Sequence, residues 1–178
     1  MTIGNEFLDQ SRKVFCSQKD LADKAIAQLG DPDLLWQPDP ESNSIAINMK
    51  HLAGNMISRW TDFLTTDGEK PDRNRDGEFE ISKNDLDGLR EYWERGYAVF
   101  FASIDSLKDD DLLKIVTIRN ELHTVIQAIQ RQISHYGYHV GQIVSSAKQI
   151  KKEQWKTLSI ERGKSAEFFK SISHPAKN

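Results

Sequence analysis

The most conspicuous shortage in this sequence is cysteine, because Cys16 is the only one among 178 residues. A single cysteine cannot form a disulfide within the chain, and it excludes a zinc site built from several thiolates. A reactive thiol at Cys16 is conceivable, but a half-buried structural cysteine is the more common situation. The chain therefore has neither a disulfide framework nor a cysteine-rich zinc site.

Long apolar runs and a surplus of positive charge are also missing. The longest unbroken apolar run, at residues 98–102, is far shorter than the ~20 residues that cross a bilayer. The first ten residues, MTIGNEFLDQ, have neither the basic nor the apolar region of a signal peptide. The net charge of −3 argues against nucleic acid as a partner, since phosphate binding needs a basic surplus. These features predict a cytoplasmic protein that binds neither nucleic acid nor a membrane.

Alternating strand patterns of convincing length are lacking as well, and helical periodicity takes their place. The length suits one domain that spans residues 1–178, and the composition, 38% hydrophobic and 29% charged, is ordinary for a globular protein. Apolar residues recur with the period of a helix in four segments, residues 2–29, 45–63, 86–107 and 122–148. Four amphipathic helices joined by loops predict an all-α fold, a four-helix bundle.

Turn-forming and capping residues set the expected helix boundaries. Ser44 is expected to cap the second helix. Residues 67–81, DGEKPDRNRDGEFEI, are polar and rich in turn formers, so we expect a loop there. Ser82 with Asp85 fits a capping box for the third helix. We expect a second loop over residues 108–121, in which VTIR could extend briefly.

Two of the five histidines stand one helical turn apart in the stretch HYGYHVGQIV, residues 135–144. At about 100° per residue, His135 and His139 lie about 40° apart at the edge of the apolar face of their helix. Two imidazoles at this spacing can hold one metal ion. Gly137 and Gly141 fall on the opposite flank, and they suggest that another helix backbone, of this chain or of a second subunit, approaches closely.

The second expected helix has a matching polar stripe. It recurs at steps of 3, 4, 3 and 4 residues and consists of Asn48, His51, Asn55, Ser58 and Asp62. His51 therefore has the same relation to its apolar face as His135 and His139 have to theirs. If the two flanks face each other, the three imidazoles converge, and we predict a divalent-metal site at these histidines. The plainer alternative is three half-exposed, hydrogen-bonded histidines at the edge of a core.

The neighbours of these histidines suggest supporting roles and a kind of chemistry. We expect Asn48, Asn55 and Gln132 to orient the imidazoles, and His123 to be a pocket-rim or capping residue. Three neutral histidines leave a divalent ion an open coordination position, from which it can activate water or a thiol. Proteases of the HExxH class need a glutamate directly after the first histidine, whereas this chain has Tyr136 there, in a phase that points into the core. The motif therefore argues against such a protease and favours a metal-activated nucleophile such as a thiol.

Two long stretches carry a family resemblance. SIAINMKHLAGNMISRWTDFLTTDGEKPDRNRDGEF and HTVIQAIQRQISHYGYHVGQIVSSAKQI resemble the DinB/YfiT-like metalloenzyme superfamily, in particular a bacterial branch without an assigned activity. The resemblance covers nearly the whole chain. It implies a four-helix bundle, often dimeric, that holds a divalent metal, zinc or nickel, through one histidine of the second helix and two of the fourth. The matching positions here are His51, His135 and His139.

The superfamily includes thiol-dependent transferases and isomerases that use low-molecular-weight thiols such as bacillithiol or mycothiol, members induced by DNA damage, and members with no known activity. The leading hypothesis is therefore a cytoplasmic, homodimeric, metal-dependent hydrolase or thiol-dependent S-transferase acting on a small molecule. Arg59, Arg119 and His123 are candidates for substrate recognition. The alternative is a non-catalytic metal-binding protein that serves in a stress response or as a dimeric interaction module. An enzyme should have a cleft that reaches the ion, whereas a structural site should be closed.

Overall fold

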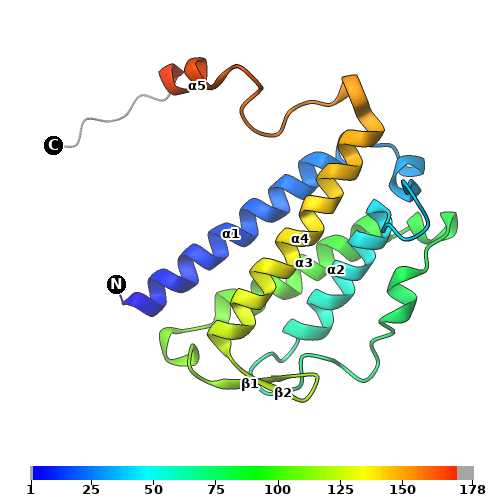
Figure 1. Ribbon diagram of the computed structural model, residues 1–178. Coiled ribbons are helices and arrows are strands. Elements are labelled where there is room, and N and C mark those ends of the chain that lie inside the picture. The colour runs from blue at the N-terminus through cyan, green and yellow to red at the C-terminus, as the bar shows by residue number, and fades with distance from the viewer. Residues whose placement is uncertain (1, 172–178) are drawn as a thin grey trace.

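The computed structural model describes residues 2–171, and its secondary structure is mostly helical (Figure 1). The α-helices are α1 (Ile3–Ile26), α2 (Ile45–Trp60), α3 (Leu89–Ser106), α4 (Val125–Lys151) and the short α5 (Ser165–Ser171). The four long helices fall within or close to the four segments of helical period, so the predicted helical class is confirmed. Within residues 2–171, every helix is too short or too polar to span a bilayer.

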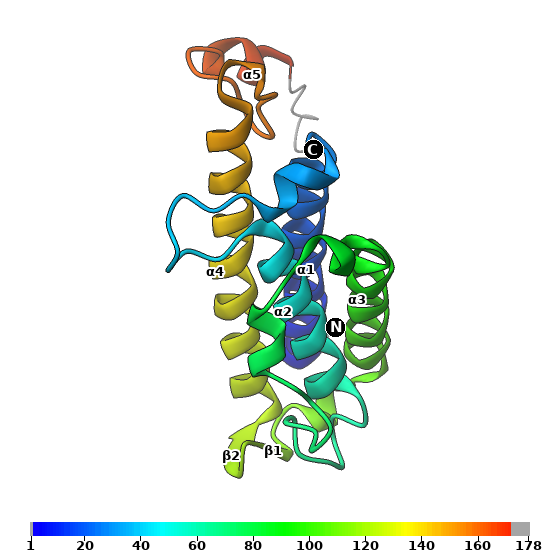
Figure 2. The same cartoon turned by 90° about the vertical axis from the view of Figure 1, so that its right-hand side faces the viewer.

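The four long helices lie side by side, with α1 along α4 and α2 along α3 (Figures 1 and 2). α2 also packs against α4, which leaves it little contact with solvent. All of its 16 residues except Lys50 and Ile57 are buried. Because α2 carries polar as well as apolar side chains, its polar groups must find their hydrogen-bond partners inside the protein.

An aromatic cluster fills the space between the long helices. Phe15 of α1, Phe100 of α3 and Tyr136 of α4 pack edge to face, with ring centroids 4.6 Å (Phe15–Phe100) and 5.5 Å (Phe100–Tyr136) apart. Trp60 of α2 packs on Phe100, and its indole N–H donates to the Tyr136 hydroxyl over 3.3 Å. Tyr136 is fully buried, as its helical phase predicts. These contacts hold α4 in a defined orientation against α2, so the residues next to Tyr136 are placed with it.

The first two helices end about three residues earlier than expected. α1 ends at Ile26, and Ala27 serves as its C-cap. α2 ends at Trp60, because Asp62 has a φ of 49°, in the left-handed region that cannot continue a helix. Phe63 is still buried, so its apolar character reflects the core and not the helix.

The third helix begins later than the sequence suggests. The capping box of Ser82 and Asp85 does form, but it closes a separate 3₁₀ turn, Lys83–Leu86. Gly88 then has a φ of +80°, a conformation that favours glycine, and α3 starts at Leu89. The prediction that this capping box starts the third helix is therefore wrong, because a 3₁₀ turn and an α-helix use the same cap.

A β-hairpin interrupts the helical architecture between α3 and α4. Its strands, β1 (Ile115–Ile118) and β2 (Glu121–Thr124), are antiparallel. Arg119 and Asn120 connect them with φ values of 55° and 62°, the geometry of a type I′ turn. The brief extension expected at VTIR is confirmed by β1, but the expected loop over residues 108–121 misses β2 and the hairpin pairing, because strands of four residues are too short to show a clear alternation.

The hairpin also moves the start of the fourth helix. The hydroxyl of Thr124, the last residue of β2, accepts a hydrogen bond from the backbone N–H of Gln127, and the side-chain oxygen of Gln127 accepts one from the Thr124 N–H. This capping box starts α4 at Val125, three residues after the expected position 122.

α2 and α3 approach each other closely at Gly96. A Cβ on Gly96 would lie 2.8 Å from the Cα of Ala53, closer than real Cβ atoms come. A Cβ on Gly137 would meet the amide nitrogen of Gln18 at 3.1 Å, and one on Gly141 would have nothing within 4 Å. The expected helix packing on Gly137 and Gly141 is therefore wrong for the described part of this chain. Packing there by a second subunit stays a prediction.

We expect Gly96→Ala to lower the free energy of unfolding by about 1–3 kcal/mol, because the added methyl group overpacks the contact between α2 and α3. Gly141→Ala should raise it by up to about 1 kcal/mol, because its methyl group enters open space on a helix. Urea unfolding followed by circular dichroism measures both. Equal effects of the two substitutions would contradict the close contact at Ala53.

Candidate metal centre

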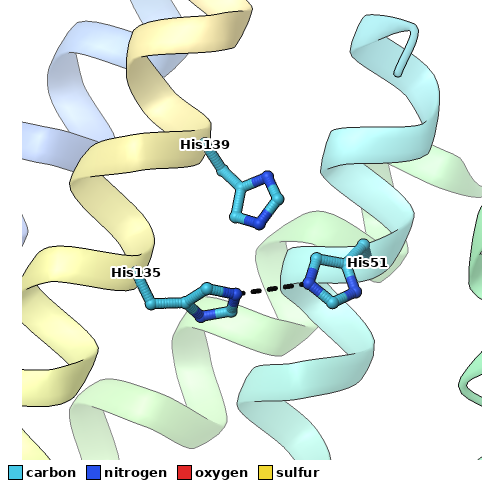
Figure 3. A group of neighbouring side chains, drawn as sticks. All are labelled: His51, His135 and His139. Carbon is cyan, nitrogen blue, oxygen red and sulfur yellow. Dashed lines mark hydrogen bonds between the residues drawn. The ribbon is translucent and has the colours of Figure 1, made fainter. Parts of the chain in front are cut away.

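Three histidines from two helices converge on one point. His51 projects from α2, and His135 and His139 project from consecutive turns of α4 (Figure 3). One ring nitrogen from each lies within 4.8 Å of the others, and the Nε2 atoms of His51 and His135 are 3.3 Å apart. His51 is 5% and His139 6% exposed, whereas His135 is half-buried. The cluster therefore lies just below the surface and opens towards it on the side of His135.

Glu78 holds the ring of His51. Its carboxylate Oε2 lies 2.8 Å from His51 Nδ1, so that nitrogen donates and the Nε2 lone pair is left to face the other two rings. Arg73 donates two hydrogen bonds to the same carboxylate, from Nε to Oε1 at 2.7 Å and from Nη2 to Oε2 at 2.8 Å. Burial opposes the charge on Glu78, but the hydrogen bonds from His51 and Arg73 outweigh it and lower the pKa of Glu78 below its usual value.

Gly54 makes this contact possible. Glu78 belongs to a 3₁₀ turn, Asp76–Phe79, which brings its carboxylate against the surface of α2. A Cβ on Gly54, three residues after His51, would clash with Glu78 Oε1. Because Gly54 has no side chain, Glu78 can cross the surface of α2 and reach His51.

Asn48 holds the ring of His139 in a similar way. Its Oδ1 lies 2.8 Å from His139 Nδ1, and its amide nitrogen donates to the carbonyl of Ser44, which fixes which end of the amide faces the ring. His139 Nδ1 therefore donates, and its Nε2 lone pair is free. Two of the three imidazoles thus present an unprotonated Nε2.

His135 has a different partner. Gln132 lies 3.0 Å from His135 Nδ1 through its amide nitrogen, which also donates to Asn55 Oδ1 at 3.1 Å. The buried Arg59 fixes this orientation, because its Nη1 donates to Gln132 Oε1 at 2.8 Å and an arginine can only donate. His135 Nδ1 is therefore an acceptor, which places its proton on Nε2, facing His51. Binding of a cation by Nε2 of all three neutral rings requires the proton of His135 to move from Nε2 to Nδ1.

All of these surroundings keep the α4 histidines neutral. Burial, with a further contribution from the neighbouring imidazoles, lowers the pKa of His135 to about 3 and that of His139 to about 4. Protons therefore do not compete with a cation for these rings at neutral pH. Three neutral imidazoles suit zinc or nickel, and no fourth His, Cys, Asp or Glu joins them within residues 2–171. The donor set fits a divalent ion with an open coordination position.

The structure brings most of the predicted supporting residues to the cluster. Asn48 contacts His139, Gln132 contacts His135, and Asn55 contacts Gln132. His123 lies elsewhere, in β2, where its Nε2 is 3.7 Å from the Glu121 carboxylate, and Thr124 takes the capping position beside it.

Sequence reasoning missed Glu78 and Arg73. Both lie in the segment 67–81, which has no helical period that could place a side chain on a face. The alternating acidic and basic residues there, as in EKPDRNRDGE, are the only available signal, and they are equally typical of an exposed loop.

We expect Glu78→Gln to weaken binding of zinc or nickel by about 10- to 100-fold, because the amide loses the charge that polarises His51 and leaves Arg73 half-neutralised. Competition with a chromophoric chelator measures this affinity. Glu80→Gln is the matched control, since the exposed Glu80 lies two residues away and takes part only through its backbone carbonyl. An unchanged affinity in a folded Glu78→Gln variant would contradict the role of Glu78.

The metal-free protein should lose stability as the pH falls from about 6.5 towards 4. The unfolded chain binds protons on His135 and His139 below the ordinary pKa of 6.5, whereas the folded chain does not until about pH 4. Protons therefore favour the unfolded state, by up to about 1.4 kcal/mol per pH unit for each histidine. Urea unfolding at pH 7, 6 and 5 tests this. A His135→Gln/His139→Asn variant should show a shallower decline, and parallel curves would refute the depressed pKa values.

Comparison with family models matches residues 2–164 to a family described as a protein of unknown function, DUF1572. Searches of curated proteins and of solved structures gave no match. The matched region includes α1 to α4 and all three histidines of the cluster. The chain therefore belongs to the DUF1572 family.

Proposed function

We propose that this protein is a metal-dependent enzyme, a hydrolase or a thiol-dependent S-transferase, in which His51, His135 and His139 hold one zinc or nickel ion. The observation that carries the proposal is the convergence of three imidazoles whose ligand atoms lie within 4.8 Å of one another. The hydrogen bonds to Glu78 and Asn48 support it, because carboxylate and amide acceptors on Nδ1 are typical of metal-binding histidines.

The residues around the cluster have separable roles in such an enzyme. A bound ion would supply Lewis acidity that lowers the pKa of a water molecule or a thiol. Glu78 and Asn48 hold two rings in the orientation that binding needs, and Gln132 and Arg59 set the proton on the third. Burial on the α2 side excludes bulk water, and the half-exposed His135 leaves one direction of approach for a small molecule.

The wider assignment is part of the same proposal. The arrangement of α1 to α4 is consistent with a DinB-like four-helix bundle, and the histidines come from α2 and α4, as the resemblance to that superfamily implies. A low-molecular-weight thiol is then the proposed co-substrate. We also propose a homodimer, for which the exposed glycine flank of α4, around Gly141, is the candidate surface.

A non-catalytic metal-binding protein is the second candidate. It is favoured by the burial of His51 and His139, which are only 5% and 6% exposed and so resemble ligands of a closed site. The two candidates differ in whether a thiol can reach the bound ion. An enzyme must admit it, whereas a closed site must exclude it.

The test measures metal and thiol access together. Elemental mass spectrometry of untagged protein should give about one equivalent of metal per chain, which is lost in His51→Ala and kept in His123→Ala. The cobalt-substituted protein should then gain a sulfur-to-metal absorption band when a small thiol is added. Absence of metal after reconstitution would overturn both candidates. Metal without a thiol band or turnover on electrophiles would leave the non-catalytic one.

A further inference from the structure

A second candidate site lies on the other side of Glu78 from the histidines. A cavity of about 610 Å³ opens between α2, α3 and residues 70–78, and none of the three histidines lines it. Its volume is in the range of small-molecule sites. Glu78 and Arg73 form the wall that it shares with the metal centre.

The lining of this cavity carries more positive than negative charge. Its charged residues are the cations Lys50, Lys70, Arg73 and Arg95 and the carboxylates Asp72 and Glu78. Arg73 is already neutralised by Glu69 and Glu78. Lys70 donates only to the backbone carbonyls of Ser58 and Asp67, at 2.9 and 2.7 Å. Arg95 makes no hydrogen bond or ion pair with any described residue. Asp72 and two other nearby aspartates attract the charge of Lys70, but neither Lys70 nor Arg95 forms an ion pair with a described residue, so both remain able to pair with a bound anion.

A hydrogen-bond donor stands beside these cations. Tyr92 lines the cavity, and its hydroxyl has no hydrogen-bond partner among the described residues. A Cβ on Gly54 would lie 3.2 Å from this hydroxyl, so Tyr92 and Glu78 both pack against the surface of α2 at Gly54. Burial raises the pKa of Tyr92, and the hydroxyl therefore stays protonated and able to donate at neutral pH.

We propose that this cavity binds an oxyanion, the carboxylate or phosphate group of a small molecule, through Lys70, Arg95 and the Tyr92 hydroxyl. Cationic side chains with an added neutral donor are the usual partners of such groups, and the hydrogen bonds they form are the strong, charge-assisted kind. Asp72, which also lines the cavity, limits the net positive charge and so disfavours highly charged polyanions. This site does not depend on the proposed function, because none of its donors contacts the histidines.

Glu78 nevertheless links the cavity to the metal centre. Its Oε1 faces Gly54 and Arg73 on the cavity side, and its Oε2 accepts from His51. A molecule bound in the cavity is therefore separated from His51 by a single carboxylate. A bound anion could therefore influence the metal centre only through Glu78.

Isothermal titration at pH 7 and low salt, with inorganic phosphate and with malonate as probes, tests the proposal. We expect saturable binding of one equivalent of at least one probe, weakened about 10-fold or more in Lys70→Gln/Arg95→Gln, because charged hydrogen bonds are lost. Tyr92→Phe should weaken it several-fold. The control Lys83→Gln/Arg90→Gln removes the same charge outside the cavity and should bind as the wild type does.

The two probes distinguish a phosphate-bearing from a carboxylate-bearing ligand. Binding that persists in His51→Ala separates this site from the metal centre, so a failure of the metal proposal leaves it standing. If the double variant fails to fold, Arg95→Gln alone decides, because the exposed Arg95 supports no other residue. Absence of saturable binding to both probes, or an equal loss in the cavity and control variants, would overturn the proposal.

Discussion

The hydrogen bond between His51 and Glu78 ties together parts of the chain that are far apart in sequence. It attaches the segment after α2 to α2 itself and fixes the ring that faces α4. A buried carboxylate keeps its charge only where hydrogen bonds and an opposite charge replace water, and Arg73 supplies both to Glu78. Arg73 in turn is balanced by Glu69. The orientation of one imidazole thus depends on a series of buried charges, each of which would be unfavourable without the next.

The burial of α2 explains why the cluster has so many supporting contacts. A helix that is enclosed on nearly all sides cannot leave Asn48, Asn55 or His51 to water, so each is paired inside the protein. The pairing leaves the rings unequal. His51 and His139 present an unprotonated Nε2, whereas His135, at the more exposed edge, carries its proton there. His135 is therefore the ring that would have to change its tautomer if a cation bound, and its greater exposure lets water exchange that proton.

Helical phase is the part of this structure that the sequence predicts well. Spacings of three and four residues place Asn48, His51 and Asn55 on one flank of α2. They place His135 and His139 on one flank of α4 in the same way, independently of the loop conformations. No comparable sequence spacing predicts the β-hairpin or the contact between Glu78 and His51. The strands are only four residues long. The position of Glu78 depends on the path of its loop, and that path is possible only because Gly54 has no side chain. Periodicity places residues within an element, whereas contacts between a loop and a helix depend on packing that no local pattern encodes.

The charges around the histidines also bear on what the site would accept. Arg59 is 3% exposed, has no carboxylate partner among the described residues, and stays protonated at neutral pH although burial lowers its pKa to about 10. Arg59 and Arg73 together balance Glu69 and Glu78, and the α4 imidazoles are neutral, so the surroundings contribute little net charge. A divalent ion added to such a site brings a positive charge that the protein does not neutralise. In a buried setting this favours an anionic nucleophile or substrate over a neutral one, because the Coulomb energy is screened only weakly there. The excess of cations in the cavity behind Glu78 acts in the same direction, so both faces of that carboxylate favour negatively charged molecules.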